Sequence, residues 1–480
     1  NLEQARQLRE RTPAAGQARL EELYLSLGRA KELMGDYDGA LAVYDALQEA
    51  ARKTADKRLE LAALMARTTV YAAPTQHYDP QQVTILTEQA LPLARELEDF
   101  AAESKILWNL MLLKLFTGDL EAAVADGEAS LAIAREHDLR ERAAYALHDL
   151  LRAYLFSGRM EEGLEAAHEA QVLWRELDNK AMLADNLIGT AGSVNFMQGE
   201  YEKAIGPLQE ALALSREIDN LWNQSFAYHT LGSIYFMLGR LGEAIEACQA
   251  AVEIGMRAGF MIPLFVNGSI LALIYGMSGR PDLGLPYVNK ARAVAEESQL
   301  RDQQAAPLAA MAFIHLCRGE MEAAEAFIAH SYEMMEPGSL SAGVLFTFPI
   351  DGRLRLAIGE FERAVDTAEN LLNYLKQTRL RLFLPDGYYF KGRGLVGLGR
   401  IAEGREVLEW AREEAERQGA RTILWEILAT LAELEEGAGH LDAAETLREK
   451  AGEGVEFIMD GLPGELRQGF LEQVKTFSFD

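Results

Sequence analysis

Hydrophobic residues recur at helical spacing along almost the whole chain, in runs of about 17 residues separated by short polar turns. Residues 241–255 and 263–277 illustrate the pattern, because each run carries apolar side chains at helical spacing and Gly259 stands in the break between them. Such paired runs predict helical hairpins in which each helix is about 25 Å long.

A glycine recurs at the turn between the two helices of each predicted hairpin. It is followed two residues later by a bulky residue and five residues later by a small one, as in Gly199, Tyr201 and Ala204. The turn glycines lie at positions 35, 118, 158, 199, 239, 279, 319, 359, 399 and 439, so the intervals from 118 onward are equal except for one that is a single residue longer. We expect each glycine to provide the left-handed backbone conformation that ends a helix.

The first interval, from position 35 to position 118, is as long as two of the later intervals, so one turn glycine is missing from it. Segment 77–80 is predicted to carry the missing turn, with Asp79 as the helix N-cap and Pro80 at the first helical position. A fixed period of this length predicts stacked supersecondary units, here about eleven helical hairpins.

One repeat carries the motif of a known family at its usual offsets, in residues Tyr228, Leu231, Gly232, Tyr235, Gly239, Ala244 and Ala251. Gly232 and Ala244 are expected where the two helices of the hairpin cross, since a larger side chain would push the axes apart. The chain resembles the tetratricopeptide-repeat (TPR) family, which implies an all-α fold, a right-handed αα-superhelix. We expect one solenoid over residues 1–480, with repeats at about 16–455 and a C-terminal capping segment at 456–480.

The period, about 40 residues, is longer than that of the standard repeat, which is about 34 residues, so the helices are expected to be longer. This long form resembles the sensor arm of the signal-transduction ATPases with numerous domains (the STAND family), such as the maltose-regulon activator. The resemblance implies that an inducer or partner binds the array and relieves autoinhibition. It also implies a nucleotide-binding core N-terminal to the array, and the chain itself contains no GxxxxGK[ST] loop.

Composition and charge exclude several classes of function. With 47 basic and 74 acidic residues the formal charge is −27, and this field repels phosphate backbones, so no nucleic-acid partner is expected. The two cysteines, Cys248 and Cys317, form no CxxC pair, which favours a reducing, cytoplasmic location. Segment 260–277 is mostly apolar but is interrupted by Pro263 and Gly268, and it keeps the repeat register, so no membrane span is predicted.

Catalytic and metal-binding motifs are absent from the sequence. Segment 168–172 begins like an HExxH motif but lacks the second histidine, and segment 339–343 has serine in place of the first glycine of a nucleophile elbow. The eight histidines form no short-range ligand pair. We therefore expect a binding protein that is not an enzyme and has no catalytic residue, metal or cofactor.

The inner face of the predicted superhelix is uncharged at its centre. In such arrays the first helix of each hairpin lines the concave side, at positions 13, 10, 9 and 6 before the turn glycine. For four central hairpins these are Asn186, Gly189, Thr190, Ser193, Phe226, His229, Thr230, Ser233, Val266, Ser269, Ile270, Leu273, Ala306, Ala309, Ala310 and Phe313. None is charged, although 25% of the chain is charged, and about four charges are expected by chance.

A weakly polar centre with aromatic and charged groups around it favours a mostly neutral ligand, either a small-molecule or a peptide inducer. The predicted ligand-binding residues are Trp108, His148, Arg152, Asn186, Thr190, His229, Thr230, Ser233, Ser269, Arg353, Tyr389 and Arg393. Two alternatives stay open. The array could be a protein–protein interaction scaffold that holds partner segments in an open groove, or its centre could pack against a neighbouring part of the superhelix or a domain outside this chain.

Overall fold

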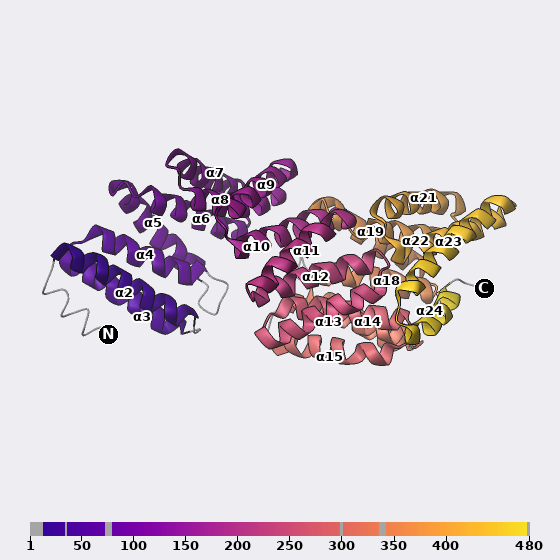
Figure 1. Ribbon diagram of the computed structural model, residues 1–480. Helices are drawn as coiled ribbons and strands as arrows, with labels where there is room; N and C mark the ends of the chain where they lie inside the picture. The colour runs from indigo at the N-terminus through magenta and orange to yellow at the C-terminus, as the bar shows by residue number, and fades with distance from the viewer. Residues whose placement is uncertain (1–12, 34–35, 73–78, 298–300, 336–341, 478–480) are drawn as a thin grey trace. The chain divides into compact units, whose positions relative to one another are not determined.

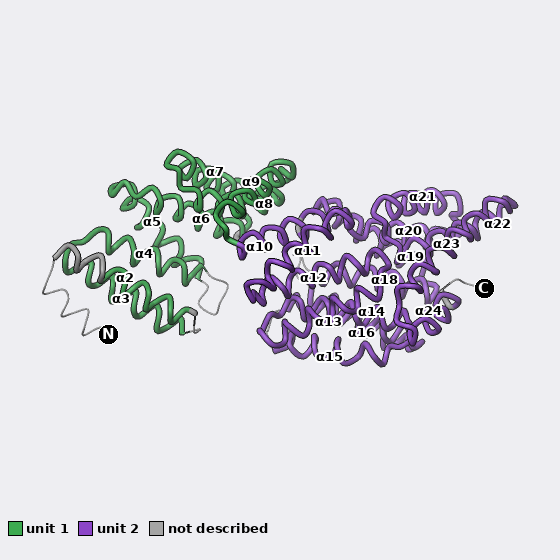
Figure 2. Tube along the Cα trace, in the orientation of Figure 1, with its two compact units in different colours: residues 1–179 green, residues 180–480 purple. Residues whose placement is uncertain are grey.

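The computed structural model describes residues 13–33, 36–72, 79–297, 301–335 and 342–477. Within these ranges the chain is helical and contains no β-strand, which confirms the all-α fold class. The helices form two compact units, residues 1–179 and 180–480 (Figure 2). Each unit is a succession of helical hairpins (Figure 1), and a single solenoid through both units stays a prediction.

Unit 1 contains four hairpins in its described residues. They are α2 (Pro13–Leu33) with α3 (Tyr37–Thr54), α4 (Lys57–Ala72) with α5 (Pro80–Glu96), α6 (Phe100–Thr117) with α7 (Leu120–Glu136), and α8 (Arg140–Phe156) with α9 (Met160–Glu176).

Unit 2 contains seven hairpins and a closing helix in its described residues. The first four hairpins are α10 (Lys180–Thr190) and η1 (Ala191–Phe196) with α11 (Tyr201–Glu217), α12 (Leu221–Met237) with α13 (Leu241–Ala258), α14 (Met261–Met277) with α15 (Pro281–Glu297), and α16 (Ala305–Cys317) with α17 (Met321–Met334). The short 3-10 helix η2 (Arg301–Gln304) precedes α16.

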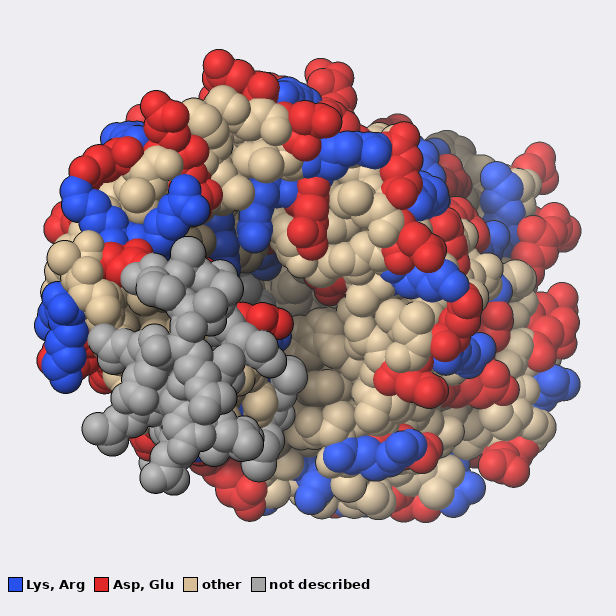
Figure 3. All heavy atoms as spheres, turned by 60° about the vertical axis from the view of Figure 1, so that its left-hand side comes forward, with Lys and Arg blue, Asp and Glu red and all other residues tan. Residues whose placement is uncertain are grey.

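The last three hairpins of unit 2 are α18 (Ala342–Ala357) with α19 (Phe361–Thr378), α20 (Leu384–Gly397) with α21 (Ile401–Gln418), and α22 (Arg421–Gly437) with α23 (Leu441–Gly461). The closing helix is α24 (Gly464–Phe477). Four and seven described hairpins make the eleven that the sequence predicts, and α24 lies in the predicted capping segment. Figure 3 shows acidic and basic side chains interspersed over the outer surface.

The turns are formed by the predicted residues. The nine turn glycines from 118 to 439 have φ between 67° and 84°, a conformation that glycine adopts easily because it has no Cβ. Gly35, His77 and Tyr78 lie outside the described residues. Asp79 caps α5, since its carboxylate accepts hydrogen bonds from the backbone N–H groups of Gln81 and Gln82.

The small residues of the motif lie where helices approach closely. A Cβ added to Gly232 of α12 would be 2.6 Å from Sγ of Cys248 on α13, so a larger residue would separate the two helices. Ala244 of α13 is completely buried. The TPR-like packing within this hairpin is therefore confirmed.

The interval between Gly158 and Gly199, which is one residue longer than the other later intervals, contains a π-helix. Helix α10 continues directly into η1, a π-helix of six residues from Ala191 to Phe196. A π-helix accommodates one extra residue in a turn while the flanking segments stay helical. The extra residue therefore alters the end of the first helix of this hairpin and leaves the repeat intact.

Unit 2 closes on itself, because hairpins that are five repeats apart are hydrogen-bonded to each other. The backbone N–H groups of Arg381 and Leu382, before α20, donate to the carbonyl oxygen of Met197, at 2.9 and 3.1 Å. The hydroxyl of Thr422 on α22 donates to the carbonyl oxygen of Met237, at the end of α12, at 3.2 Å. Helix α13 also packs against α23, and α14 packs against α24. Early and late hairpins thus surround a common interior.

Candidate functional site

An apolar cavity of about 220 Å³ lies in the interior of unit 2. Its wall consists of Phe196, Met197, His229, Ser233, Phe236, Met237, Ile262, Val266, Ile270, Leu273, Leu345, Phe346, Pro349, Ile350, Leu382 and Phe383. None of these sixteen residues is Asp, Glu, Lys or Arg. All belong to the first helix of a hairpin or to an adjoining turn, namely η1, α12, α14, α18 and the turn before α20.

The wall of the cavity combines earlier and later hairpins of unit 2. One side is formed by η1, α12 and α14, and the other by α18 and the turn before α20. Ile262, at the start of α14, is 47% exposed, so the cavity reaches the surface there. Helices α14 and α18 are linked by α16, which packs against both, whereas the end of η1 and the turn before α20 meet where the unit closes.

The turn before α20 has an unusual backbone. Phe383 has φ of 57°, in the left-handed region that a bulky side chain rarely adopts. The neighbouring N–H groups of Arg381 and Leu382 are both held by the carbonyl oxygen of Met197. These hydrogen bonds maintain the conformation in which Phe383 forms part of the wall.

His229 is the principal polar group of the wall. Its Nδ1 lies 2.9 Å from Oδ1 of Asn267, while Nδ2 of Asn267 donates to the carbonyl oxygen of His229. Because Asn267 presents its oxygen, Nδ1 of His229 carries the proton and Nε2 is the acceptor. Burial lowers the pKa of His229 although the hydrogen bond to Asn267 opposes this shift. The ring is therefore neutral near pH 7.

A smaller cavity of about 60 Å³ adjoins the apolar one, with which it shares six wall residues. Its wall also contains Arg353, Asp386 and Thr422. Both Nη atoms of Arg353 donate to the carboxylate of Glu426, at 2.9 and 2.8 Å. Burial alone lowers the pKa of Arg353, but attraction to Glu426 outweighs it and keeps the pKa above its usual value.

The predicted hydroxyl ligands of unit 2 are already engaged within their own helices. The hydroxyls of Thr190, Thr230, Ser233 and Ser269 each donate to the carbonyl oxygen four residues earlier, at 2.9, 3.1, 3.0 and 2.7 Å. Among these four residues, only Ser233 belongs to the wall of the apolar cavity.

The remaining predicted residues of unit 2 lie outside the wall of the apolar cavity. Asn186 and Tyr389 are buried, with exposed fractions of 1% and 5%. Arg393 forms a 3.3 Å ion pair with Glu433. Of the nine candidates in unit 2, His229 and Ser233 line the apolar cavity and Arg353 lines the smaller one.

The other three predicted residues, Trp108, His148 and Arg152, lie in unit 1. Nε1 of Trp108 donates to the buried carboxylate of Asp149 at 2.9 Å, and Arg152 forms an ion pair with the same carboxylate at 2.5 Å. Asp149 thus joins α6 and α8, and His148 precedes it on α8.

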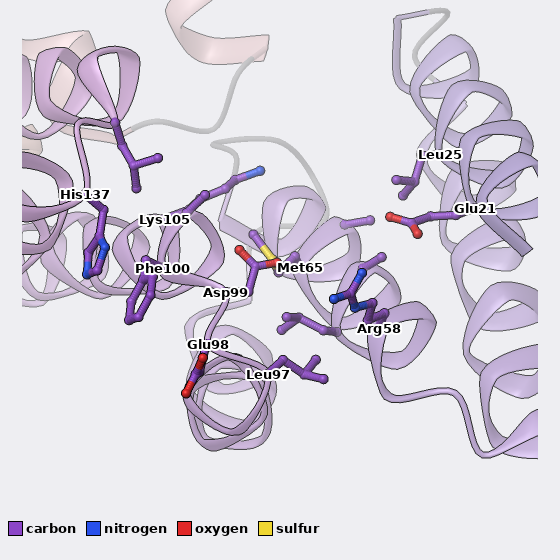
Figure 4. Close-up of a pocket in the computed structure, with 15 residues that line it drawn as sticks. Glu21, Leu25, Arg58, Met65, Leu97, Glu98, Asp99, Phe100, Lys105 and His137 are labelled. Carbon is purple, nitrogen blue, oxygen red and sulfur yellow. The ribbon is translucent and has the colours of Figure 1, made fainter. Parts of the chain in front are cut away.

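A hollow of about 740 Å³ in unit 1 has a charged wall. Figure 4 shows Glu21 on α2 facing Arg58 on α4, with Asp99 and Lys105 from the next hairpin on the same hollow. Burial lowers the pKa of Lys105, and the charge of Arg142 lowers it further. This hollow differs in kind from the apolar cavity of unit 2.

The sequence analysis missed several residues of the site. Met197, Leu382 and Phe383 lie in turns, whereas the position rule covers only the first helices. Asn267 orients His229 from a neighbouring helix position that the rule does not include. The sequence did contain a signal for Met197, because the interval between Gly158 and Gly199 is one residue longer than its neighbours. The π-helix that accommodates the extra residue ends at Phe196, directly before Met197.

Neither a metal site nor a membrane-spanning helix is present in the part of the chain that the structure describes. There, no group of three or more His, Cys, Asp or Glu side chains could hold a metal ion. No helix among the same residues is long and apolar enough to cross a membrane.

The sequence profile of the tetratricopeptide repeat matches residues 227–254, which span the turn between α12 and α13. The chain carries a tetratricopeptide repeat. This match covers one TPR unit, the same one in which the motif is complete. None of the curated proteins matches the chain.

Solved structures similar to this chain are helical-repeat proteins. A Rap protein complexed with competence and sporulation factor is 14% identical, with a TM-score of 0.52, and the similarity covers 75% of this chain and 99% of the Rap chain. Aspartyl phosphate phosphatase F from Bacillus subtilis is 14% identical, with coverages of 62% and 79% and a TM-score of 0.48. The apo quorum sensor NprR from B. thuringiensis is 14% identical, with coverages of 83% and 99% and a TM-score of 0.43. The likeness to the Rap protein supports the TPR-like fold.

Proposed function

We propose that this chain is a non-catalytic sensor and that unit 2 binds a small, mostly apolar molecule inside its closed superhelix. The observation that carries the proposal is the apolar cavity, whose sixteen wall residues include no charged side chain in a chain that is 25% charged. His229 and Ser233 supply polar atoms beside an otherwise hydrophobic wall, the arrangement typical of small-molecule sites.

The size of the cavity supports a bound molecule. An apolar cavity of about 150 Å³ holds benzene, so this one has room for a few more carbon atoms. A ligand of that size would recover contacts that the empty wall lacks.

Ligand binding would act on the closure of unit 2. The ligand would contact Met197 beside η1 as well as Leu382 and Phe383 before α20, two segments that meet where unit 2 closes. A molecule that touches both sides binds the closed form better than an open one, so it shifts the population toward closure. Through this shift, ligand binding would change the conformation of unit 2.

We further propose, from the resemblance of the long repeat period to that of STAND sensor arms, that this chain is part of a cytoplasmic regulatory ATPase of the STAND type. In that setting the chain is the sensing arm, the nucleotide-binding core lies N-terminal to it, and an inducer in unit 2 relieves autoinhibition. The similar Rap protein, whose structure was solved in complex with competence and sporulation factor, supports a binding role for the TPR-like array.

A second candidate function is a scaffold for partner segments, and the hollow of unit 1 favours it. This hollow of about 740 Å³ presents Glu21, Arg58 and Lys105, which are suited to polar segments of a protein partner. The two functions concern different units and can be tested separately.

The test of the unit 2 proposal fills the cavity and measures binding of a simple apolar probe. Leu273→Trp places a larger side chain in the wall, whereas Ile401→Trp makes a similar addition at a residue that is 48% exposed. 1-Hexanol should raise the melting temperature of the parent and of Ile401→Trp, because a ligand that binds the folded state stabilises it. Leu273→Trp should show no such rise.

A second filling variant, Val266→Phe, distinguishes loss of the cavity from a local distortion. It should also abolish the response to 1-hexanol and keep the far-UV circular dichroism of the parent. If both filling variants respond to 1-hexanol as the parent does, the cavity is not the binding site and the scaffold function takes its place.

A further inference from the structure

The charged side chains beside the apolar cavity do not cancel to a net charge of zero. Arg353 is paired with Glu426 through two hydrogen bonds, and Asp386 lies in the same small cavity wall as Arg353. Arg393, on the same helix as Asp386, forms an ion pair with Glu433. When Asp386 is ionised, Arg353, Glu426 and Asp386 together carry a net charge of −1.

Asp386 has an unsatisfied oxygen. The residue is 9% exposed, and its Oδ2 atom is buried without a hydrogen-bond partner among the described residues. Thr422 does not supply the missing donor, because its hydroxyl donates to the carbonyl oxygen of Met237. A buried polar atom without a partner is unfavourable, so this site lacks a donor or a cation.

Burial raises the pKa of Asp386 to about 7, and Glu426 acts in the same direction while Arg353 opposes it. Near neutral pH the carboxyl group therefore exchanges readily between its protonated and ionised forms. A cation placed beside it would substitute for the proton.

The geometry allows one molecule to use both cavities. Phe236, Met237, Leu273, Pro349, Ile350 and Phe383 belong to both walls, so the apolar space and the charged space adjoin. A molecule whose hydrocarbon part fills the larger cavity can extend one polar group into the smaller. That group would meet the carboxyl group of Asp386.

We propose that the ligand of unit 2 is an apolar molecule with an amine at one end, whose ammonium group donates a hydrogen bond to Asp386. The inference rests on the proposed function, because it requires the apolar cavity to bind the rest of the molecule. The ammonium brings the positive charge that the cluster lacks, and the hydrocarbon part meets a wall without charges.

The experiment compares three probes of equal carbon number, hexane, 1-hexanol and hexylamine, by isothermal titration near pH 8. The parent should bind hexylamine roughly 10- to 100-fold more tightly than 1-hexanol, as expected for a buried hydrogen bond to a charged group. Asp386→Asn keeps the size of the side chain and should remove this preference while binding 1-hexanol as the parent does.

Glu406→Gln provides the matched control, because Glu406 is an exposed carboxylate on the outer helix α21. It should keep the full preference for hexylamine, which shows that the amine does not simply bind the acidic surface. Leu273→Trp should bind none of the three probes.

The outcomes separate the two proposals. If the parent binds 1-hexanol and hexylamine equally, or if Asp386→Asn keeps the preference, the amine inference is wrong although the cavity still binds apolar molecules. In that case a proton or a water molecule satisfies Asp386. If the parent binds none of the probes, the proposed function fails together with the inference.

Discussion

Replacing Arg353 with methionine is expected to destabilise unit 2 by about 3–5 kcal/mol, because it leaves a buried carboxylate without its cation. Both Nη atoms of Arg353 donate to Glu426, whose side chain is 5% exposed. Methionine preserves most of the hydrocarbon volume, so the loss reports the charge and not a new void. The measurement is urea unfolding followed by far-UV circular dichroism, with the midpoint compared at a common slope.

A surface pair provides the control. Arg400 and Glu403 form an ion pair with side chains that are 52% and 59% exposed, so Arg400→Met should leave the urea midpoint close to that of the parent. The double variant Arg353→Met with Glu426→Leu should regain most of the stability, because an apolar pair can replace a buried ion pair. If Arg353→Met is no more destabilising than Arg400→Met, the pair is not buried in solution and the closed interior of unit 2 is wrong.

Three further outcomes are expected. Although burial raises the pKa of Glu414, hydrogen bonds from Arg417 and neighbouring donors lower it to about 2. Because the pKa of Glu414 is lower in the folded state than in the unfolded state, Glu414→Gln should reduce the free energy of unfolding by about 1–2 kcal/mol at pH 7. The stability difference between parent and variant should disappear as the pH falls from about 4.5 to 2. A pH series of urea midpoints measures it. The pKa of Asp386 is raised by burial to about 7, so the parent should lose stability as the pH rises from about 4 to 7, and Asp386→Asn should lack this slope in melting curves. Leu231 is 3% exposed, so Leu231→Ala should lower the free energy of unfolding by about 2–5 kcal/mol. Val172 is 54% exposed, and Val172→Ala should change that free energy by no more than about 0.5 kcal/mol. Equal urea midpoints for the two variants would contradict the predicted packing.

The hairpins could be predicted from the sequence because their determinants are local. The turn glycines fix the ends of the helices through their own backbone conformation, and Gly232 fixes a helix crossing within one hairpin. Runs predicted at 241–255 and 263–277 are observed as Leu241–Ala258 and Met261–Met277. Such features depend on residues that lie within one period, so periodicity alone reveals them.

The candidate site could be predicted only in part, because it depends on contacts between distant hairpins. The rule for the inner face placed His229, Ser233 and Ile270 correctly toward the interior, where they line the cavity. It treated Arg353 as a group free to bind a ligand, whereas Arg353 is paired with Glu426, 73 residues away in sequence. That pairing depends on how α18 and α22 are placed across the one hairpin between them, and no pattern within a single period encodes it.

Two departures from the regular repeat meet at the cavity, and their coincidence favours a functional origin. The π-helix η1 absorbs the extra residue of the one longer interval and ends at Phe196, while Phe383 holds a left-handed conformation that costs about 1–3 kcal/mol. Both residues line the apolar wall, and the carbonyl oxygen of Met197, next to η1, holds the turn that contains Phe383. Regular hairpins would stack without either irregularity. Their presence next to each other in the wall of one cavity indicates that these residues maintain the shape of this interior and not the stacking of the repeats.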